Sequence, residues 1–140
     1  MLRRVIAGSV LVVLSAGCGD DADPESAEGG PAQSGPVIAV EGWNSYPEAE
    51  VVGELRLVDG CLLIDDSVVF WADGTTWDAA KKAVVFETAD PVRVGEVFSG
   101  GGGGYAKSNL DGLDGLDVQA VKKCLVRTRS KTAVVAAPPG

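Results

Sequence analysis

The sequence predicts a mainly β domain: a small antiparallel barrel or sandwich, OB-like in one form, with about six to seven short strands and one short helix. Residues 51–58 alternate in polarity and place Leu55 and Leu57 on one face. Asp59-Gly60 follows as a two-residue hairpin turn, because both residues tolerate a positive φ. Further short β-branched runs separated by turn residues are typical of a small all-β fold.

The remaining elements follow in order along the chain. Asp117 is a suitable N-cap for a helix over residues 118–123. Gly95 interrupts one β-branched run and indicates a bulge or a sharp bend. Because aromatic residues are few, we expect a core of Val, Leu and Ile with one or two of the three tryptophans. Strands are expected at residues 61–64, 68–71, 83–86, 92–98, 124–128 and 132–136.

The first 17 residues have the pattern of a secretory signal peptide. Arg3 and Arg4 precede an apolar run from Val5 to Leu14, which is too short to span a bilayer as a helix. The segment 14–18, Leu-Ser-Ala-Gly-Cys, resembles the lipobox of bacterial lipoproteins. That resemblance implies cleavage before Cys18, acyl chains such as palmitate on its thiol, and anchoring to the cell membrane or the outer membrane without spanning it. The alternative is an ordinary signal peptide with Cys18 incidental.

Residues 18–36 form an acidic linker with no large apolar side chain, which we expect to be disordered. Residues 37–140 then form a single β-rich domain. The chain carries 12 basic and 20 acidic residues, and its signal segment contains two of the basic ones. This acidic balance argues against nucleic acid as a partner, because phosphate backbones need a basic surface.

Two cysteines remain once Cys18 is set aside for the lipid. In an oxidising compartment Cys61 and Cys124 are expected to form a disulfide. Two free buried thiols are the alternative.

The order of several short motifs is similar to that of small bacterial lipoproteins of unknown function, which share a β domain marked by glycine and cysteine. The resemblance covers most of residues 50–136 and implies fold more than function, since no catalytic role belongs to that group. The motifs are Gly53-Glu54-Leu55, Asp59-Gly60-Cys61-Leu62, Val69-Phe70-Trp71, Gly74, Val94-Gly95-Glu96 and the glycine run from Gly100.

Few residues suit catalysis or cofactor binding. The chain has no histidine, which removes the commonest general base and transition-metal ligand. Gly101 to Ser108 differs from a phosphate-binding loop by Ala106, but turn residues follow it where a helix is needed. We therefore expect a flexible loop at residues 100–104, with neither nucleotide nor cofactor bound.

Asp111, Asp114 and Asp117 recur every three residues and are weak candidates for calcium ligands. The alternative is an acidic solvated loop that packs on the domain through Leu113 and Leu116.

Basic residues gather near the C-terminus. Arg127, Arg129 and Lys131 alternate, and on a strand they would share one face, with Lys122 and Lys123 just upstream. Such a face would suit an anionic polymer or an acidic partner, although a solvated face that discourages edge pairing is the simpler interpretation.

Trp71, Trp77 and Tyr105 lie near expected loops. Exposed, they could contact a sugar or peptide ligand; buried, they would fill the core.

The expectation for function is a non-enzymatic binding module on a membrane-anchored envelope lipoprotein, with a protein or glycan partner. A carboxylate-dependent hydrolase using Asp73, Asp78 or Asp111 is one alternative, although no catalytic pair is identifiable by spacing. A purely structural accessory is the other.

Overall fold

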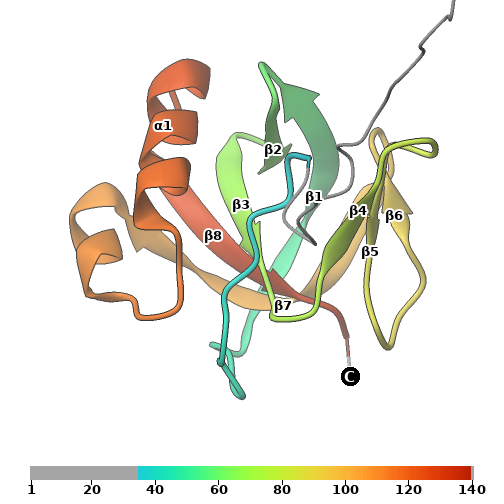
Figure 1. Cartoon of the computed structure of the whole chain (residues 1–140), viewed down its shortest axis with the longest axis horizontal. Coiled ribbons are helices and arrows are strands. Elements are labelled where there is room, and N and C mark those ends of the chain that lie inside the picture. Colours follow the sequence, from blue (N-terminus) through green and yellow to red (C-terminus); the bar gives the residue numbers. More distant parts are fainter. Residues whose placement is uncertain (1–34, 140) are drawn as a thin grey trace, which may run out of the picture.

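A computed structural model describes residues 35–139 of the chain; the signal segment, Cys18 and almost all of the expected linker lie outside this range. Within this range strands dominate, and its one α-helix lies on the opposite side from a small second sheet (Figure 1). The elements are β1 (Ala49–Val58), β2 (Cys61–Ile64), β3 (Ser67–Trp71), β4 (Thr76–Asp78), β5 (Ala83–Val85), β6 (Val92–Arg93), β7 (Val97–Ala106), the 3₁₀ helix η2 (Lys107–Gly112), α1 (Val118–Thr128) and β8 (Thr132–Ala137).

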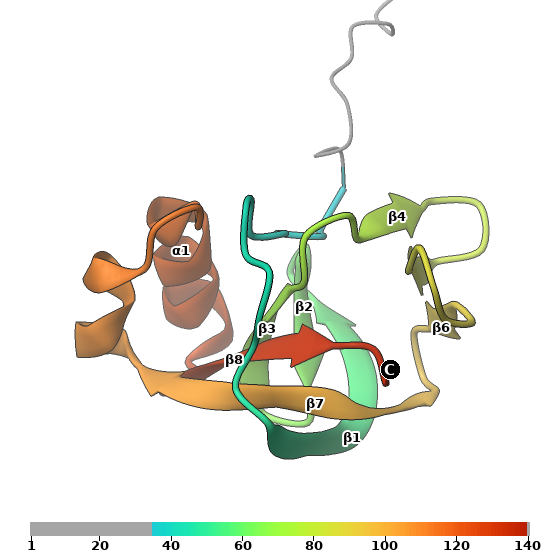
Figure 2. The same ribbon diagram turned by 90° about the horizontal axis from the view of Figure 1, so that it is seen from below.

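Five strands close into a barrel in the order β1-β2-β3-β8-β7, and β4-β5-β6 form the separate sheet. In Figure 2, β7 and β1 form the lower side of the barrel, and the small sheet with β4 and β6 lies to its right. The mainly β prediction is confirmed. Because β7 returns to lie beside β1, the barrel has a Greek-key arrangement, as does the five-stranded OB fold. One pair departs from an all-antiparallel barrel, since β3 and β8 run parallel.

The β1–β2 hairpin forms where the sequence predicts it. Asp59 and Gly60 have φ values of 51° and 79°, and the strands pair with Val58 opposite Cys61. Leu55 is fully buried, whereas Leu57 is 37% exposed.

Strands β2 and β3 are buried on both faces, so neighbouring residues point into different cores. Trp71 packs with Phe86 and Phe98 on the side of the small sheet. Phe70 packs on the opposite side, with Leu110 of η2 and Val121 of α1. These strands therefore hold the helix and the small sheet on opposite sides of one layer.

Helix α1 begins as predicted, with the Asp117 carboxylate accepting a hydrogen bond from the Ala120 amide. It continues to Thr128, so the strand expected at 124–128 is wrong. Val121, Cys124 and Leu125 are buried at helical spacing, and this periodicity outweighs the local β-like composition. Within residues 35–139 no helix has the length and apolar character needed to cross a membrane.

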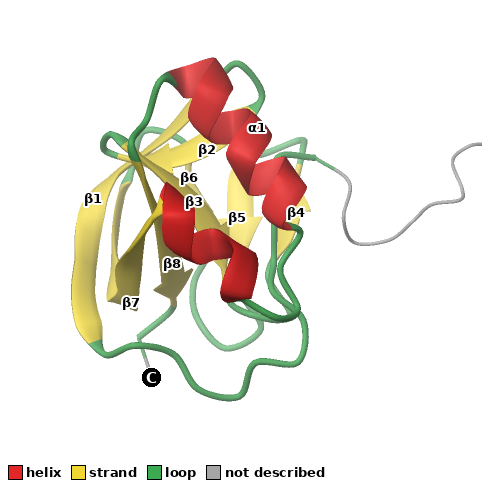
Figure 3. Ribbon diagram, turned by 90° about the vertical axis from the view of Figure 1, so that its left-hand side faces the viewer, coloured by secondary structure: helices red, strands yellow, loops and turns green. Residues whose placement is uncertain are grey.

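Cys124 fixes α1 to the barrel. Its sulfur lies at disulfide-bonding distance from that of Cys61 on β2, as the sequence predicts, and the two Cα atoms are 5.7 Å apart. A cross-link between residues 63 positions apart stabilises a fold by about 4 kcal/mol in the chain-entropy model. Figure 3 shows α1 lying across the barrel, with η2 beside it.

The glycine run is not a flexible loop, and that expectation is wrong. Residues 100–104 lie within β7 and pair with β1 on one side and β8 on the other. A Cβ at Gly100 or Gly102 would collide with a carbonyl oxygen of β8, so only glycine permits this close approach. The expected strand at 92–98 is also divided in two, with Gly95 at φ 96° making the predicted bend.

We expect Gly102→Ala to lower the free energy of unfolding by about 3 kcal/mol, because its Cβ would meet the Val135 carbonyl and its φ is 149°. Gly104→Ala is the matched control: the nearest atom to its Cβ lies 3.9 Å away, so the change should stay within about 0.5 kcal/mol. Urea unfolding of the parent and of the two variants measures both changes in the free energy of unfolding. Equal losses in the two variants would contradict the assignment of close packing to Gly102.

Candidate functional site

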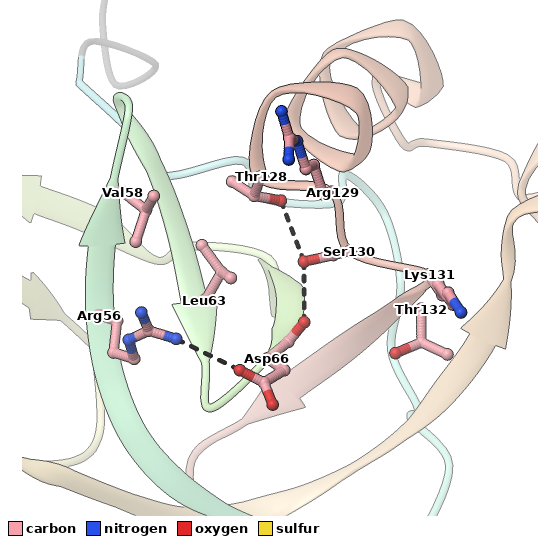
Figure 4. Close-up of a pocket in the computed structure, with 9 residues that line it drawn as sticks. All are labelled: Arg56, Val58, Leu63, Asp66, Thr128, Arg129, Ser130, Lys131 and Thr132. Atoms are coloured by element: carbon pink, nitrogen blue, oxygen red, sulfur yellow. Dashed lines mark hydrogen bonds and ion pairs between the residues drawn. The ribbon is translucent and has the colours of Figure 1, made fainter.

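An open pocket of about 460 Å³ lies between β1, the β2–β3 turn and the connection from α1 to β8. Figure 4 shows Arg56 reaching from β1 toward the turn, opposite the segment that follows α1. Two lining residues are apolar and the other seven are polar or charged. They are Arg56, Val58, Leu63, Asp66, Thr128, Arg129, Ser130, Lys131 and Thr132.

The floor of the pocket is the β2–β3 turn, which hydrogen bonds from two neighbouring segments hold in place. The Asp65 carboxylate accepts a hydrogen bond from the Glu54 amide at 3.0 Å. Arg56 Nη1 donates to the Asp65 carbonyl at 3.0 Å, and Ser130 Oγ donates to the Asp66 carbonyl at 2.8 Å. The turn is therefore tied to β1 on one side and to the α1–β8 connection on the other.

Hydroxyl groups hold the opposite wall. Thr128 Oγ1 lies 2.7 Å from the Cys124 carbonyl, to which it donates, and 3.0 Å from Ser130 Oγ. The hydroxyls of Ser67 and Thr132 lie 2.8 Å apart and join β3 to β8. Cys124 lies one helical turn before Thr128 and pairs with Cys61 of β2, so this wall is also fixed to the barrel.

Arg129 ends α1 in the left-handed conformation, with φ 59° and ψ 26°. Glycine is the usual residue at this position, since a side chain there costs on the order of 1 kcal/mol. The backbone places the Arg129 side chain beside Ser130 at the rim of the pocket (Figure 4). Residues in sparsely populated backbone conformations gather at functional sites, although Asp59, Asp65 and Lys82 also have a positive φ in this domain.

The pocket is basic although the domain is acidic. Residues 35–139 carry 10 Lys and Arg against 15 Asp and Glu. Arg56 pairs with Asp66 at 3.4 Å, and the Asp66 side chain is fully exposed. Arg129 and Lys131 are exposed, and neither has a carboxylate within 4.0 Å in the described part of the chain. The three cations and one carboxylate give the lining a formal charge of +2.

The predicted basic strand face is wrong, because residues 124–128 are helical. The structure brings Arg129 and Lys131 to the pocket, whereas Arg127 does not line it and Lys122 pairs with Asp111 at 2.7 Å. Lys123 is exposed elsewhere on α1.

Sequence reasoning missed Arg56 and Asp66, which reach the pocket from segments more than 60 positions away. Arg56 lies on the polar face of β1, and the alternation that predicts the strand also places it there. Its contacts with Asp65 and Asp66 depend on the tertiary structure, so the local pattern does not reveal them.

The three calcium candidates do not converge. Asp111 pairs with Lys122, Asp117 caps α1, and the Asp114 carbonyl accepts a hydrogen bond from Trp43 Nε1 at 2.6 Å. Among residues 35–139 no three acidic, cysteine or histidine side chains are grouped in a way that could hold a metal ion.

Two of the candidate aromatics pack on the domain itself. Trp71 is fully buried, so it has no exposed surface for a ligand. Tyr105 is half-buried, with its ring 5.9 Å from that of Phe70. Trp77 is half-buried and lines a shallow groove with Leu57, beside Gly35 and Pro36.

The carboxylates considered for hydrolysis lie in different elements. Asp78 caps a turn by accepting from the Lys81 amide at 3.0 Å. Asp73 accepts from the Gly42 amide at 2.8 Å and lines a pocket of about 230 Å³ that also contains Glu87. No sequence pattern indicates that Asp73 and Glu87 line the same pocket.

We expect Arg129→Gly to leave the free energy of unfolding unchanged or raise it by up to about 1 kcal/mol, because relief of the left-handed strain offsets the charge lost at the helix C-terminus. Arg127→Gly, inside the same helix, should lower it by about 1 kcal/mol. Chemical unfolding of both variants measures the two changes in the free energy of unfolding, of which only that of Arg127→Gly should be a loss. An equal loss in both would show that Arg129 has a structural role.

No protein-family model matches this chain, and no match was found among curated proteins or among solved structures. The similarity to small bacterial lipoproteins therefore stays a prediction from the sequence motifs.

Proposed function

We propose that this chain is an extracytoplasmic lipoprotein whose barrel domain is a non-enzymatic binding module. Acyl chains on Cys18 hold it to the membrane, and the linker places the domain near the membrane surface. The observation that carries the binding role is the basic pocket, which is concave and open to solvent. Hydrogen bonds join its floor, the β2–β3 turn, to β1 and to the α1–β8 connection.

The position of the pocket on the barrel supports a binding role. In OB folds, ligands bind on the second and third strands and on the loops that join strands 1–2 and 4–5. Here the pocket is lined by β1, by β2, by the β2–β3 turn and by the connection between the fourth and fifth barrel strands, β7 and β8. Of these, β2 and this connection correspond to parts that bind ligands in OB folds. This is an analogy of architecture alone.

The cysteine pair supports a location outside the cytoplasm. Disulfides persist in oxidising compartments and are rare in the cytosol. Cys61 and Cys124 lie at bonding distance in the core beneath α1, where the cross-link would stabilise a small domain.

The hydrolase alternative has one observation in its favour, the carboxylates of Asp73 and Glu87 in one pocket. The Asp73 carboxylate is already engaged by the Gly42 amide, which fixes the segment before β1 against the end of β3. We therefore favour binding over catalysis.

We expect the parent chain to incorporate labelled fatty acid and to fractionate with membranes, and Cys18→Ala to do neither, because the thiol is the acylation site. Ser15→Ala changes a neighbouring small residue and should leave both unchanged. Radiolabelling and cell fractionation measure the two properties. Membrane association of Cys18→Ala equal to that of the parent would overturn the anchor.

A photoreactive residue tests the binding role in intact cells of the source. Placed at Thr132, an exposed residue of the pocket lining, it should form adducts that the same residue at Lys81, an exposed position in the β4–β5 turn, does not form. Mass spectrometry identifies the adducts. Identical patterns from both positions, or no adduct from Thr132, would contradict the binding role.

A further inference from the structure

We infer that the basic pocket binds a phosphate monoester. This inference deepens the proposed binding function by naming the ligand chemistry. It follows from the charge of the lining, from the placement of its cations and from the left-handed arginine at its rim.

The charge favours a dianion. The lining has a formal charge of +2, and a phosphate monoester carries about −1.5 to −2 at neutral pH, whereas a carboxylate carries −1. Asp66 is fully exposed and its 3.4 Å pair with Arg56 is long, so this pair costs little to break. The other guanidinium N–H groups of Arg56 can bind an incoming anion while Nη1 keeps its hydrogen bond to the Asp65 carbonyl. Two arginines also provide planar donor forks that match phosphate oxygens.

The arrangement of donors favours one anionic group over an extended polymer. Arg56 enters from β1, and Arg129 and Lys131 flank Ser130 across the pocket, so cations stand on opposite walls (Figure 4). A volume of about 460 Å³ leaves room for a polar body attached to the phosphate.

The backbone at Arg129 provides the independent argument. A glycine would fit the left-handed position without strain, yet the residue present carries a cation to the rim. Lys82 is also left-handed, but Arg129 is the one such cation that lines the basic pocket, where its side chain can bind an anion beside Lys131.

The experiment is calorimetric titration of the full chain in detergent micelles with four probes: glucose 6-phosphate, glucuronate, glucose and inorganic phosphate. Glucose 6-phosphate should bind about tenfold more tightly than glucuronate, since the sugar body is similar and the charge is doubled. Glucose should not bind. Equal affinity for glucose 6-phosphate and glucuronate, or no heat with glucose 6-phosphate at millimolar concentration, would overturn the inference.

The source of the phosphate is decided by two further comparisons. Short-chain phosphatidic acid in the same micelles carries the monoester on a lipid, and tighter binding of it than of glucose 6-phosphate would assign the pocket to a lipid headgroup. Tighter binding of glucose 6-phosphate than of both phosphatidic acid and inorganic phosphate would assign it to a phosphorylated sugar.

Variants locate the site. Arg56→Gln and Arg129→Gly should each weaken glucose 6-phosphate binding about tenfold or more, because each removes a charge-assisted contact. Lys81→Gln removes the same charge from an exposed turn of the small sheet and should leave affinity unchanged. Because Arg129→Gly is not expected to destabilise the fold, lost binding in that variant reports on the pocket. Unchanged affinity in both arginine variants would overturn the assignment to this site.

The outcomes separate this inference from the proposed function. Adducts at Thr132 without phosphate binding would leave a binding module with a different ligand. Phosphate binding in a chain that is not acylated at Cys18 would leave the pocket intact and remove the membrane anchor.

Discussion

The burial of β2 and β3 on both faces is the constraint on which the rest of this structure depends. Phe70 and Trp71 are adjacent in sequence but pack into opposite cores, so β3 cannot shift by one residue without exchanging the two sides. The turn between β2 and β3 inherits this rigidity. It forms the floor of the basic pocket, and its carbonyls accept hydrogen bonds from Arg56 and Ser130. The floor of the pocket is therefore joined directly to the two strands that are buried on both faces.

The second fixed element is α1, and its position determines the opposite wall. Cys124 lies at bonding distance from Cys61, while Val121 and Leu125 pack into the same core. The helix therefore ends at a defined place beside the β2–β3 turn. A left-handed residue there turns the chain sharply into β8, which pairs in parallel with β3. This geometry explains how cations more than 70 residues apart in sequence line one pocket.

Sequence patterns predict those elements that depend only on residues close together in the sequence. The Asp59-Gly60 turn, the Asp117 cap and the Gly95 bend each depend on a few neighbouring residues, and all three are present. The predictions are wrong where contacts between residues distant in sequence determine the secondary structure. Residues 124–128 have a β-like composition but complete a helix because their buried positions continue its period, and the glycines of β7 are strand because β8 passes too close for a side chain. The pocket was only half predictable: Arg129 and Lys131 stand out as a local cluster, whereas Arg56 joins them through tertiary structure.

The five glycines of β7 also have a consequence for how the barrel assembles. They bring no side-chain surface of their own, so this seam is held mainly by main-chain pairing to β1 on one side and β8 on the other. A glycine-rich segment loses more conformational freedom on ordering than any other, and its partner in β1 lies about 50 positions away. Ordering of β7 therefore depends on both neighbours being in place, which makes ring closure a late and cooperative event in folding.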